Sequence, residues 1–326
     1  MIRTVKNRMN AETFEILKQR VMQMNTGIDD FVYTEMLNHK SSYDPVTGMR
    51  KTEFQPADNN LYSVFSVTSS DQATVYCEML TPPGSAMDSV IIYVHGAAFL
   101  RRLNDINLKT ADRLCTMAGQ AVCVPDYRVG MDYTYDQMIN DVAACYRHIL
   151  TRYGIAPERV TFLSDSSGCV TTLQMMRELA GADMPAPGKI ILWSPLADGL
   201  FDDDKMAAGK QKDITLRTNN LFTIGFDTYT KMCRGKAAQD VFPLYGNYNK
   251  LNKTRILIQS GVEEVFEEDA YQLCDAFNSF ASCDLELYEG MFHNFQTYFS
   301  VCEMAPVCWE HMIDFIRAER PEQKAS

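Results

Sequence analysis

Several features that direct a chain to particular classes of protein are absent from this sequence. No run of basic residues stands out, and Asp and Glu number 42 against 31 for Lys and Arg, so the formal net charge is −11. Nucleic acid and other polyanions are therefore not expected as partners. Residues 1–20 carry positive charge but no continuous apolar run, so we expect neither a secretory signal nor a membrane span. These absences favour a cytoplasmic protein with no membrane partner.

Metal-binding patterns are also missing. The ten cysteines include no Cys-x-x-Cys pair and are scattered through stretches typical of core strands and helices. Buried, reduced thiols are therefore expected rather than disulfides. Cys302, Cys308 and His311 do not have zinc-finger spacing. The acidic stretch 198–205 lacks the regular spacing and the terminal bidentate glutamate of a calcium loop. The sequence thus implies no metal.

The pattern of apolar residues indicates an α/β protein. Two β-type runs, 61–70 and 73–80, are separated by a polar turn and predict an antiparallel hairpin. Helical stretches then alternate with near-continuous apolar runs, as in strands buried on both faces. These runs lie at 89–96, 121–128, 159–167, 189–196, 255–261 and 283–290, and the clearest helix at 135–153. We predict a mostly parallel, doubly wound, eight-stranded sheet with helices on both faces.

The sharpest local signal is a serine-rich turn. An apolar strand runs into Ser164-Asp165-Ser166-Ser167-Gly168 and then directly into a helix. A nucleophile elbow needs this context, because the tight turn lifts one serine hydroxyl clear of the sheet at a helix N-terminus. Ser164 replaces the leading glycine of that motif. A Ser-x-Ser-x-Gly run by itself is also typical of a helix N-cap.

Neighbouring motifs favour the elbow. The strand before it ends in His95-Gly96-Ala97-Ala98-Phe99, and Asp126-Tyr127-Arg128 ends the next strand. Further matching motifs lie at 243–245, 261–265 and 288–295. Together they resemble the hormone-sensitive-lipase-like branch of the α/β-hydrolases, the fold-3 type of esterase and lipase. The resemblance covers roughly residues 60–320.

This resemblance implies a set of site residues. Ser166 would be the nucleophile, and the backbone N–H groups of Ala97, Ala98 and Ser167 would form the oxyanion hole. Such a donor contributes on the order of 3 kcal/mol to transition-state stabilisation. His95, Gly96, Asp165 and Gly168 would support these motifs, with His95 orienting the turn. Where the family has bare glycine, the methyl groups of Ala97 and Ala98 restrict the backbone and crowd the acyl site.

Five histidines are available as the base. His293 alone follows a late strand, in a loop that begins at Gly290, where the order Ser, acid, His places it. The acid must lie between them, on the loop after 255–261, to orient the imidazole. The family pattern places it at Glu263, with glutamate in place of the usual aspartate, and leaves Glu264 as the alternative.

Two segments are expected to cover this site. Residues 1–50 contain two apolar stripes and predict an N-terminal helical cap that precedes any strand: Phe14, Leu17, Val21 and Met24, then Phe31, Val32, Met36 and Leu37. The catalytic domain would then span 51–326, with a cap insertion at about 199–240. Insertions of this kind lie over the C-terminal ends of the strands, where ligands bind in open α/β sheets.

The predicted function is that of a serine carboxylesterase. It would hydrolyse a small-molecule ester with a short- to medium-chain acyl group through an acyl-enzyme, and it would need no cofactor. An amidase or peptidase of the same fold would use the same residues. A hydrolase-like binding protein without catalysis is the third possibility. The sequence leaves the natural ester and the oligomeric state, including a homodimer, open.

Overall fold

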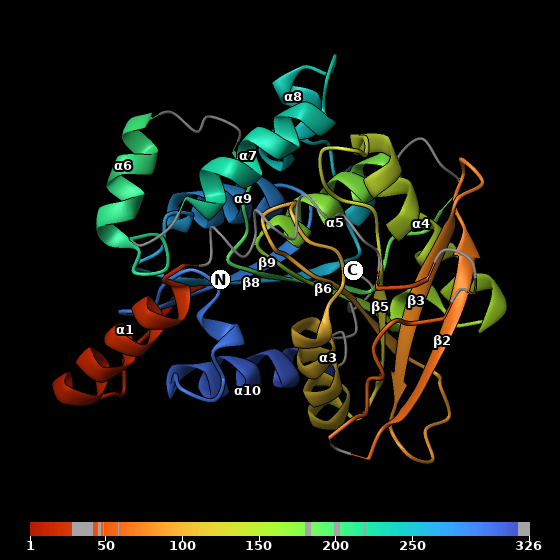
Figure 1. Cartoon of the computed structure of the whole chain (residues 1–326), viewed down its shortest axis with the longest axis horizontal. Helices are drawn as coiled ribbons and strands as arrows, with labels where there is room; N and C mark the ends of the chain where they lie inside the picture. Colours follow the sequence, from red (N-terminus) through yellow and green to blue (C-terminus); the bar gives the residue numbers. More distant parts are fainter. Residues whose placement is uncertain are drawn as a thin grey trace, which may run out of the picture.

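A single nine-stranded sheet organises the protein (Figure 1). The computed structural model describes residues 1–27, 42–44, 47, 49–57, 59–179, 184–198, 203–217 and 220–318. The strand order is β1-β9-β8-β7-β6-β4-β5-β3-β2. The strands are β1 (Ile2–Val5), β2 (Leu61–Thr68), β3 (Thr74–Thr81), β4 (Val90–Val94), β5 (Ala121–Pro125), β6 (Val160–Asp165), β7 (Lys189–Trp193), β8 (Arg255–Gly261) and β9 (Ser282–Tyr288).

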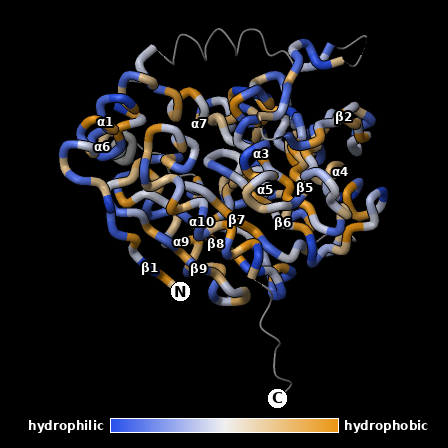
Figure 2. The backbone as a smooth tube through the Cα atoms, turned by 90° about the horizontal axis from the view of Figure 1, so that it is seen from below, coloured by the Kyte–Doolittle hydropathy of each residue, from blue (hydrophilic) through white to orange (hydrophobic). Residues whose placement is uncertain are grey.

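The predicted sheet topology is confirmed, with one strand more than expected. β3 runs antiparallel to β2 and β5, and the other neighbouring strands are parallel. β4, β5 and β6 are buried along their whole length, as strands covered on both faces should be. Figure 2 shows hydrophobic stretches among the strands at the centre of the molecule.

Helices cover both faces of the sheet. They are α1 (Ala11–Asn25), α3 (Asp105–Ala118), α4 (Tyr135–Arg152), α5 (Ser167–Glu178), α6 (Asp203–Lys212), α7 (Leu221–Met232), α8 (Ala238–Val241), α9 (Glu267–Asn278) and α10 (Met304–Arg317). Buried side chains of α4, α5 and α9 pack in one core cluster, and those of α3 and α10 pack in another. α4 begins at a capping box between Thr134 and Gln137. The helix predicted at 135–153 is therefore confirmed.

The insertion between β7 and β8 forms the helices α6, α7 and α8, which lie together above the sheet in Figure 1. The stretch 221–232 is helical. The polar composition of the preceding segment gave no sign of α6. Gly209 of α6 packs so closely on Val265 that an added Cβ would lie 2.4 Å from the valine Cγ2. The insertion is thus in direct contact with the loop that follows β8.

The N-terminal segment differs from the prediction, because it begins with a strand. Instead of preceding any strand, Ile2–Val5 form β1 and pair in parallel with β9, which makes the sheet nine-stranded rather than eight-stranded. The expected helix follows as α1, whose buried Leu17 and Val21 pack in a cluster with Met291 and Phe292. The second expected stripe, from Phe31 to Leu37, lies outside the described residues. The proposed division of the chain at residue 50 stays a prediction.

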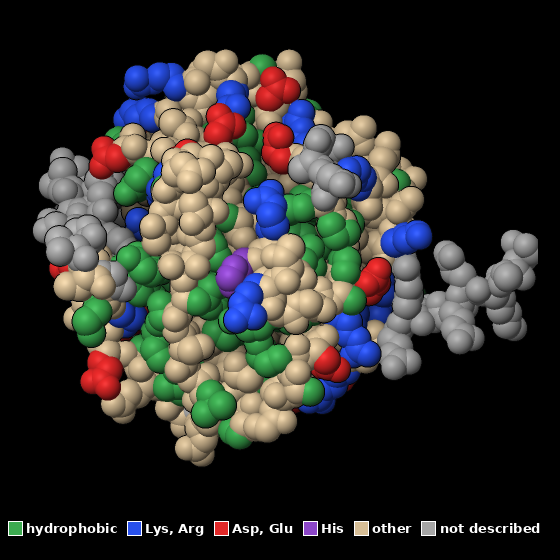
Figure 3. All heavy atoms as spheres, turned by 90° about the vertical axis from the view of Figure 1, so that its right-hand side faces the viewer, with side chains coloured by type: hydrophobic (Ala, Val, Ile, Leu, Met, Phe, Trp, Pro, Cys, Tyr) green, Lys and Arg blue, Asp and Glu red, His purple; other side chains and the backbone are tan. Residues whose placement is uncertain are grey.

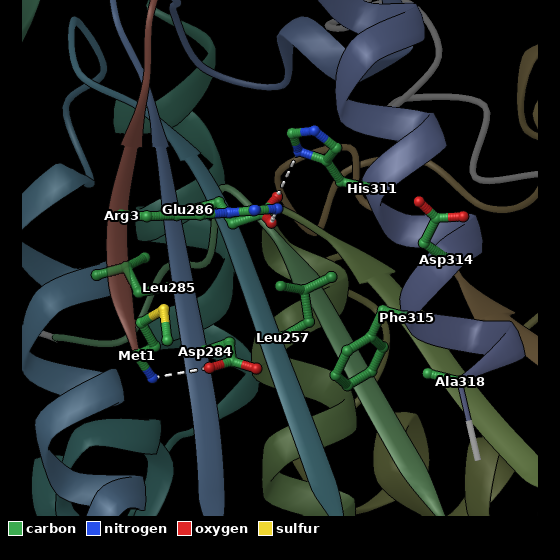
Figure 4. A pocket seen from close by; sticks show the side chains of 10 residues that line it. All are labelled: Met1, Arg3, Leu257, Asp284, Leu285, Glu286, His311, Asp314, Phe315 and Ala318. Carbon is green, nitrogen blue, oxygen red and sulfur yellow. Dashed lines mark hydrogen bonds and ion pairs between the residues drawn. The ribbon is translucent and has the colours of Figure 1, made fainter. Parts of the chain in front are cut away.

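The two edges of the sheet differ. Figure 3 shows the side of the molecule that carries β2, where hydrophobic side chains gather around a histidine. At the other edge lies a hollow of about 530 Å³, lined by residues of β1, β8, β9 and α10. Figure 4 shows the side chains that line it. There Arg3 pairs with Glu286, and the amino group of Met1 lies 2.7 Å from Asp284. None of the predicted site residues lines this hollow.

Two further expectations concern the cysteines and the helices. All ten cysteines are buried and none forms a disulfide, which confirms the expected free thiols. Within the described ranges, no helix combines the length and the apolar character needed to cross a bilayer.

Candidate active site

Ser166 occupies the strained turn between β6 and α5. Its backbone has φ 50° and ψ −122°, a region that side-chain-bearing residues rarely adopt. An added Cβ at Gly168 would lie 2.2 Å from the carbonyl oxygen of Val94, so only glycine allows α5 to approach β4 this closely. The hydroxyl of Ser164 lies 2.6 Å from that of Thr172 on α5. Serine therefore fits where the motif has its leading glycine, because its hydroxyl finds a buried partner.

The predicted base lies against this serine. His293 Nε2 is 2.9 Å from Ser166 Oγ, and both residues are buried. The rings of Phe222 on α7 and Phe266 meet the imidazole edge to face, with centroids 4.8 and 5.1 Å away. Burial lowers the pKa of His293 to about 3. The imidazole is therefore neutral and able to accept the serine proton.

The structure brings Glu264, not Glu263, to the histidine. Glu264 is 1% exposed, and its Oε2 lies 4.0 Å from His293 Nδ1. The side chain of Glu263 is exposed, while its backbone N–H donates to the carbonyl oxygen of Met291. The two neighbouring carboxylates thus differ in burial, since Glu263 is exposed and Glu264 faces inward. The carboxylate beside His293 is therefore that of Glu264, the alternative, and not that of the expected Glu263.

Glu264 is held by two hydroxyl groups. Ser194 Oγ donates to its Oε2 at 2.6 Å, and Ser260 donates to its Oε1. Burial nevertheless raises the pKa of Glu264 to about 8, although these two donors oppose the shift. Ser194 Oγ also accepts from the backbone N–H of Asn294 at 3.0 Å. Ser194 thus links the carboxylate of Glu264 to Asn294, the residue after His293.

The predicted oxyanion residues lie on a turn beside the elbow. Ala97, Ala98 and Phe99 have consecutive positive φ values of 112°, 51° and 59°. The N–H of Phe99 donates to Ser167 Oγ at 3.3 Å, which fixes this turn to the start of α5. An added Cβ at Gly96 would lie 2.6 Å from a carboxylate oxygen of Asp165, so this position requires glycine. The turn brings the backbone of 97–98 next to the elbow.

Asp165 connects the three segments of the site. Its Oδ1 accepts from the N–H of Gly96 at 3.0 Å and from the hydroxyl of Tyr93 at 2.8 Å. Its Oδ2 accepts from the side-chain amide of Asn294 at 3.0 Å. Asn294 itself has φ 54°, a left-handed conformation that asparagine tolerates better than most residues. Asn294 was not expected among the site residues, although its position directly after His293 is a signal in the sequence.

Three other histidines lie among the described residues, and each has contacts of its own. His95 is buried, with Nδ1 2.8 Å from the carbonyl oxygen of Gly96, and burial lowers its pKa to about 4. Its own carbonyl accepts from the hydroxyl of Tyr127. His148 stacks on Phe65 of β2, and His311 lies 3.0 Å from the hydroxyl of Tyr288.

A small cavity lies in front of Ser166. It is lined by Ala98, Phe99, Ser166, Ser167, Leu196, Phe222, Gly225, Phe226 and Phe266. Its free space is about 10 Å³, room for about one water molecule. α7 closes it tightly, since an added Cβ at Gly225 would lie 2.6 Å from the methyl carbon of Ala98. The methyl group that was expected to crowd the acyl site therefore also touches the cap.

Comparison with known proteins identifies the family. A model of the α/β-hydrolase fold family matches residues 91–297, which is more than half of the chain. The chain belongs to the α/β-hydrolases. This hydrolase is 27% identical over 218 residues to an acetyl-hydrolase of Streptomyces hygroscopicus, covering 65% of this chain and 69% of that protein. It is 24% identical over 272 residues to esterase LipU of Mycobacterium tuberculosis, covering 80% and 88% of the two chains.

Solved structures agree with this assignment. An esterase from the bacterial hormone-sensitive lipase family superposes on the hydrolase with a TM-score of 0.73 and 20% identity, covering 95% of this chain and 98% of that one. The expected resemblance to this branch, and the fold that it implies, are confirmed.

One group of potential metal ligands occurs among the described residues of the hydrolase. The Sγ atoms of Cys77, Cys123 and Cys145 lie within 4.8 Å of one another. They belong to β3, β5 and α4 and are packed in the apolar core. Thiolates there would carry charge in a medium that penalises it, so burial within the core is the simpler account.

The strained elbow predicts an inverted order of stability between two variants. Alanine at position 166 keeps the strain, whereas glycine relieves it, and both lose the hydroxyl. We expect Ser166→Gly to be more stable than Ser166→Ala by about 1 kcal/mol, although alanine is ordinarily the more stabilising of the two. Urea unfolding of both variants measures the difference. Greater stability of the alanine variant would contradict a strained turn.

Proposed function

We propose that the protein is a serine carboxylesterase that acts through an acyl-enzyme. The observation that carries the proposal is the 2.9 Å contact between His293 Nε2 and Ser166 Oγ, at a strained elbow beside the amides of Ala97 and Ala98. The names of its relatives, acetyl-hydrolase and esterase among them, support hydrolysis of carboxylic esters.

Acylation begins when His293 accepts the proton of Ser166 and the hydroxyl oxygen attacks the ester carbonyl. The resulting oxyanion faces the N–H groups of Ala97, Ala98 and Ser167, which stabilise it. The imidazolium then gives its proton to the departing alcohol, and the acyl group stays on Ser166. Water, deprotonated by the same histidine, attacks this acyl-enzyme and releases the carboxylic acid.

Glu264 is the acid of the proposed triad, in place of Glu263. As a carboxylate 4.0 Å from His293 Nδ1 it stabilises the imidazolium that forms in each step. Nδ1 has no hydrogen-bond partner within the described residues, so it is available to a carboxylate that moves closer during the reaction. Ser194 and Ser260 fix the orientation of that carboxylate.

Short acyl groups are the proposed substrates. The free space of this cavity, about 10 Å³, is smaller than an acetyl group, so α7 or its side chains must move before an ester can bind. Phe222 and Phe226 form its cap side, and Leu196 and Phe266 form its sheet side. Each CH₂ buried in such a pocket contributes roughly 0.8 kcal/mol until the chain exceeds the available length. The proposed substrates are therefore short- to medium-chain esters.

The cytoplasmic location also stays a prediction.

The proposed triad predicts how strongly each of three substitutions lowers esterase activity. Ser166→Ala should abolish hydrolysis of p-nitrophenyl acetate and labelling by a fluorophosphonate. Glu264→Gln should lower kcat on the order of 10³- to 10⁴-fold, because the amide cannot stabilise the imidazolium. Glu263→Gln is the matched control and should stay close to wild type. If only the Glu263 variant lost activity, Glu263 and not Glu264 would be the acid of the triad. Absence of both activity and labelling in the wild-type protein would favour a binding protein.

The buried carboxylate predicts the pH profile. His293, with a pKa of about 3, is neutral throughout the ordinary range, whereas Glu264 ionises only as the pH rises through about 8. Because the ionised carboxylate is the effective form, kcat/KM should rise with pH and level off above about 8. A pH–rate profile measures this, and Glu264→Gln should lack the rising limb. A wild-type profile that is flat across neutral and mildly alkaline pH would count against the assignment.

The cap predicts the chain-length preference. Among p-nitrophenyl esters, acetyl to about hexanoyl should be hydrolysed best and palmitoyl poorly. Phe222→Ala enlarges the cavity and should shift the optimum to a longer acyl chain. Thr223→Ala changes an exposed residue of the same helix and should leave the profile unchanged. An intact enzyme that prefers palmitoyl to butyryl esters would refute the proposed pocket and leave the triad in place.

A further inference from the structure

We infer that Asp213, a residue of the insertion, is a positioning residue that fixes the two loops carrying Glu264 and His293. Asp213 follows α6 directly and has no solvent exposure. The inference rests on the proposed esterase function, since it assigns a role in placing the base and the acid.

One oxygen of Asp213 joins both loops. Oδ2 accepts from the backbone N–H of His293 at 3.2 Å and from that of Val265, the residue after Glu264, at 3.3 Å. The loops begin after different strands, β9 and β8. A single atom that accepts from both restricts how far either can move relative to the other.

The other oxygen fixes the carboxylate itself. Oδ1 accepts from the backbone N–H of Thr215 at 2.9 Å and from its hydroxyl at 2.7 Å. The neighbouring Ile214 and Leu216 are buried in core clusters, so this short turn is anchored on both sides. Asp213 is therefore held in place independently of the loops that it contacts.

Only a carboxylate satisfies this arrangement. The four groups that point at Asp213 are all donors, and a carboxylate offers acceptors on both oxygens. Burial raises the pKa of Asp213 to about 6, so the side chain is ionised at neutral pH. Asparagine has the same shape but would direct an NH₂ group at two N–H donors. The close packing of Gly209 on Val265 brings the insertion to the same loop by a second contact.

The test compares Asp213→Asn with Asp227→Asn at pH 8. Asp227 is exposed on α7 and pairs with Lys231 one turn away. Turnover of p-nitrophenyl acetate is measured per active site, with the sites counted by fluorophosphonate titration. Asp213→Asn should lower kcat about 10- to 100-fold, the effect of misplacing a catalytic group by about 1 Å, and change KM by less than about threefold. Asp227→Asn should keep both constants within about twofold of wild type.

A role in stability alone would give a different result. If Asp213 served stability alone, Asp213→Asn would reduce the number of sites that react with the fluorophosphonate but leave kcat per site unchanged. That outcome would overturn the inference. If Asp213→Asn does not fold, Thr215→Val decides, since it removes only the hydroxyl that fixes the carboxylate. We then expect a loss of kcat of about three- to tenfold, and an unchanged kcat would overturn the inference.

A double variant separates positioning from independent effects. If Asp213 acts by placing His293 and Glu264, Asp213→Asn combined with Glu264→Gln should lose much less than the product of the two single losses. Fully multiplicative losses would contradict the inference. A wild-type protein that neither hydrolyses the ester nor reacts with the fluorophosphonate would refute the proposed function itself, which is a separate result.

Discussion

The buried carboxylate of Asp165 is the constraint on which the geometry of the site depends. It directly precedes Ser166, the proposed nucleophile, and accepts hydrogen bonds from Gly96 on the proposed oxyanion turn and from Asn294 beside His293. Three loops that follow three different strands are thereby tied to one side chain at the carboxyl ends of these strands. The strained backbone of Ser166 and the positive φ values of Ala97 and Ala98 persist because these bonds, and the close approach at Gly168, leave little alternative. A rigid frame of this kind suits catalysis, since the reacting groups need little reorganisation.

The polar network extends from this frame to the proposed acid. Ser194 donates to Glu264 and accepts from the N–H of Asn294, so the histidine loop is bound on one side to Asp165 and on the other to Glu264. Asp213 adds a third attachment from the insertion. Aromatic rings exclude water around His293. The same burial that strengthens these interactions shifts the pKa values of the acid and the base in opposite directions, so the ionisation of the pair depends on its surroundings as much as on its own chemistry.

Much of this arrangement could be predicted from the sequence, and what could not has identifiable physical causes. The elbow at Ser166 and the loop of His293 are local patterns that follow apolar strands, so they are visible without a structure. Glu263 and Glu264 are adjacent carboxylates in one turn, and only the direction of each side chain distinguishes them. β1 is four residues long and mostly exposed, so it lacks the apolar run that marks the central strands. Asp213 follows a polar helix, and its partners lie 52 and 80 residues away, which no local pattern encodes.

The pairing of β1 with β9 also has a consequence for biosynthesis. Ile2 aligns with Leu285, so the first strand of the sheet finds its partner only after the intervening residues 3–284 have been made. At ribosomal rates of about 5–20 residues per second, it waits on the order of 15 to 60 s for that partner. Contacts between such distant residues form slowly, because closing a long loop costs entropy before any contact repays it. The shortness of β1 and its charged Arg3 limit the aggregation that an unpaired strand would otherwise invite during this interval. This edge of the sheet therefore cannot be completed before residue 285 has been made.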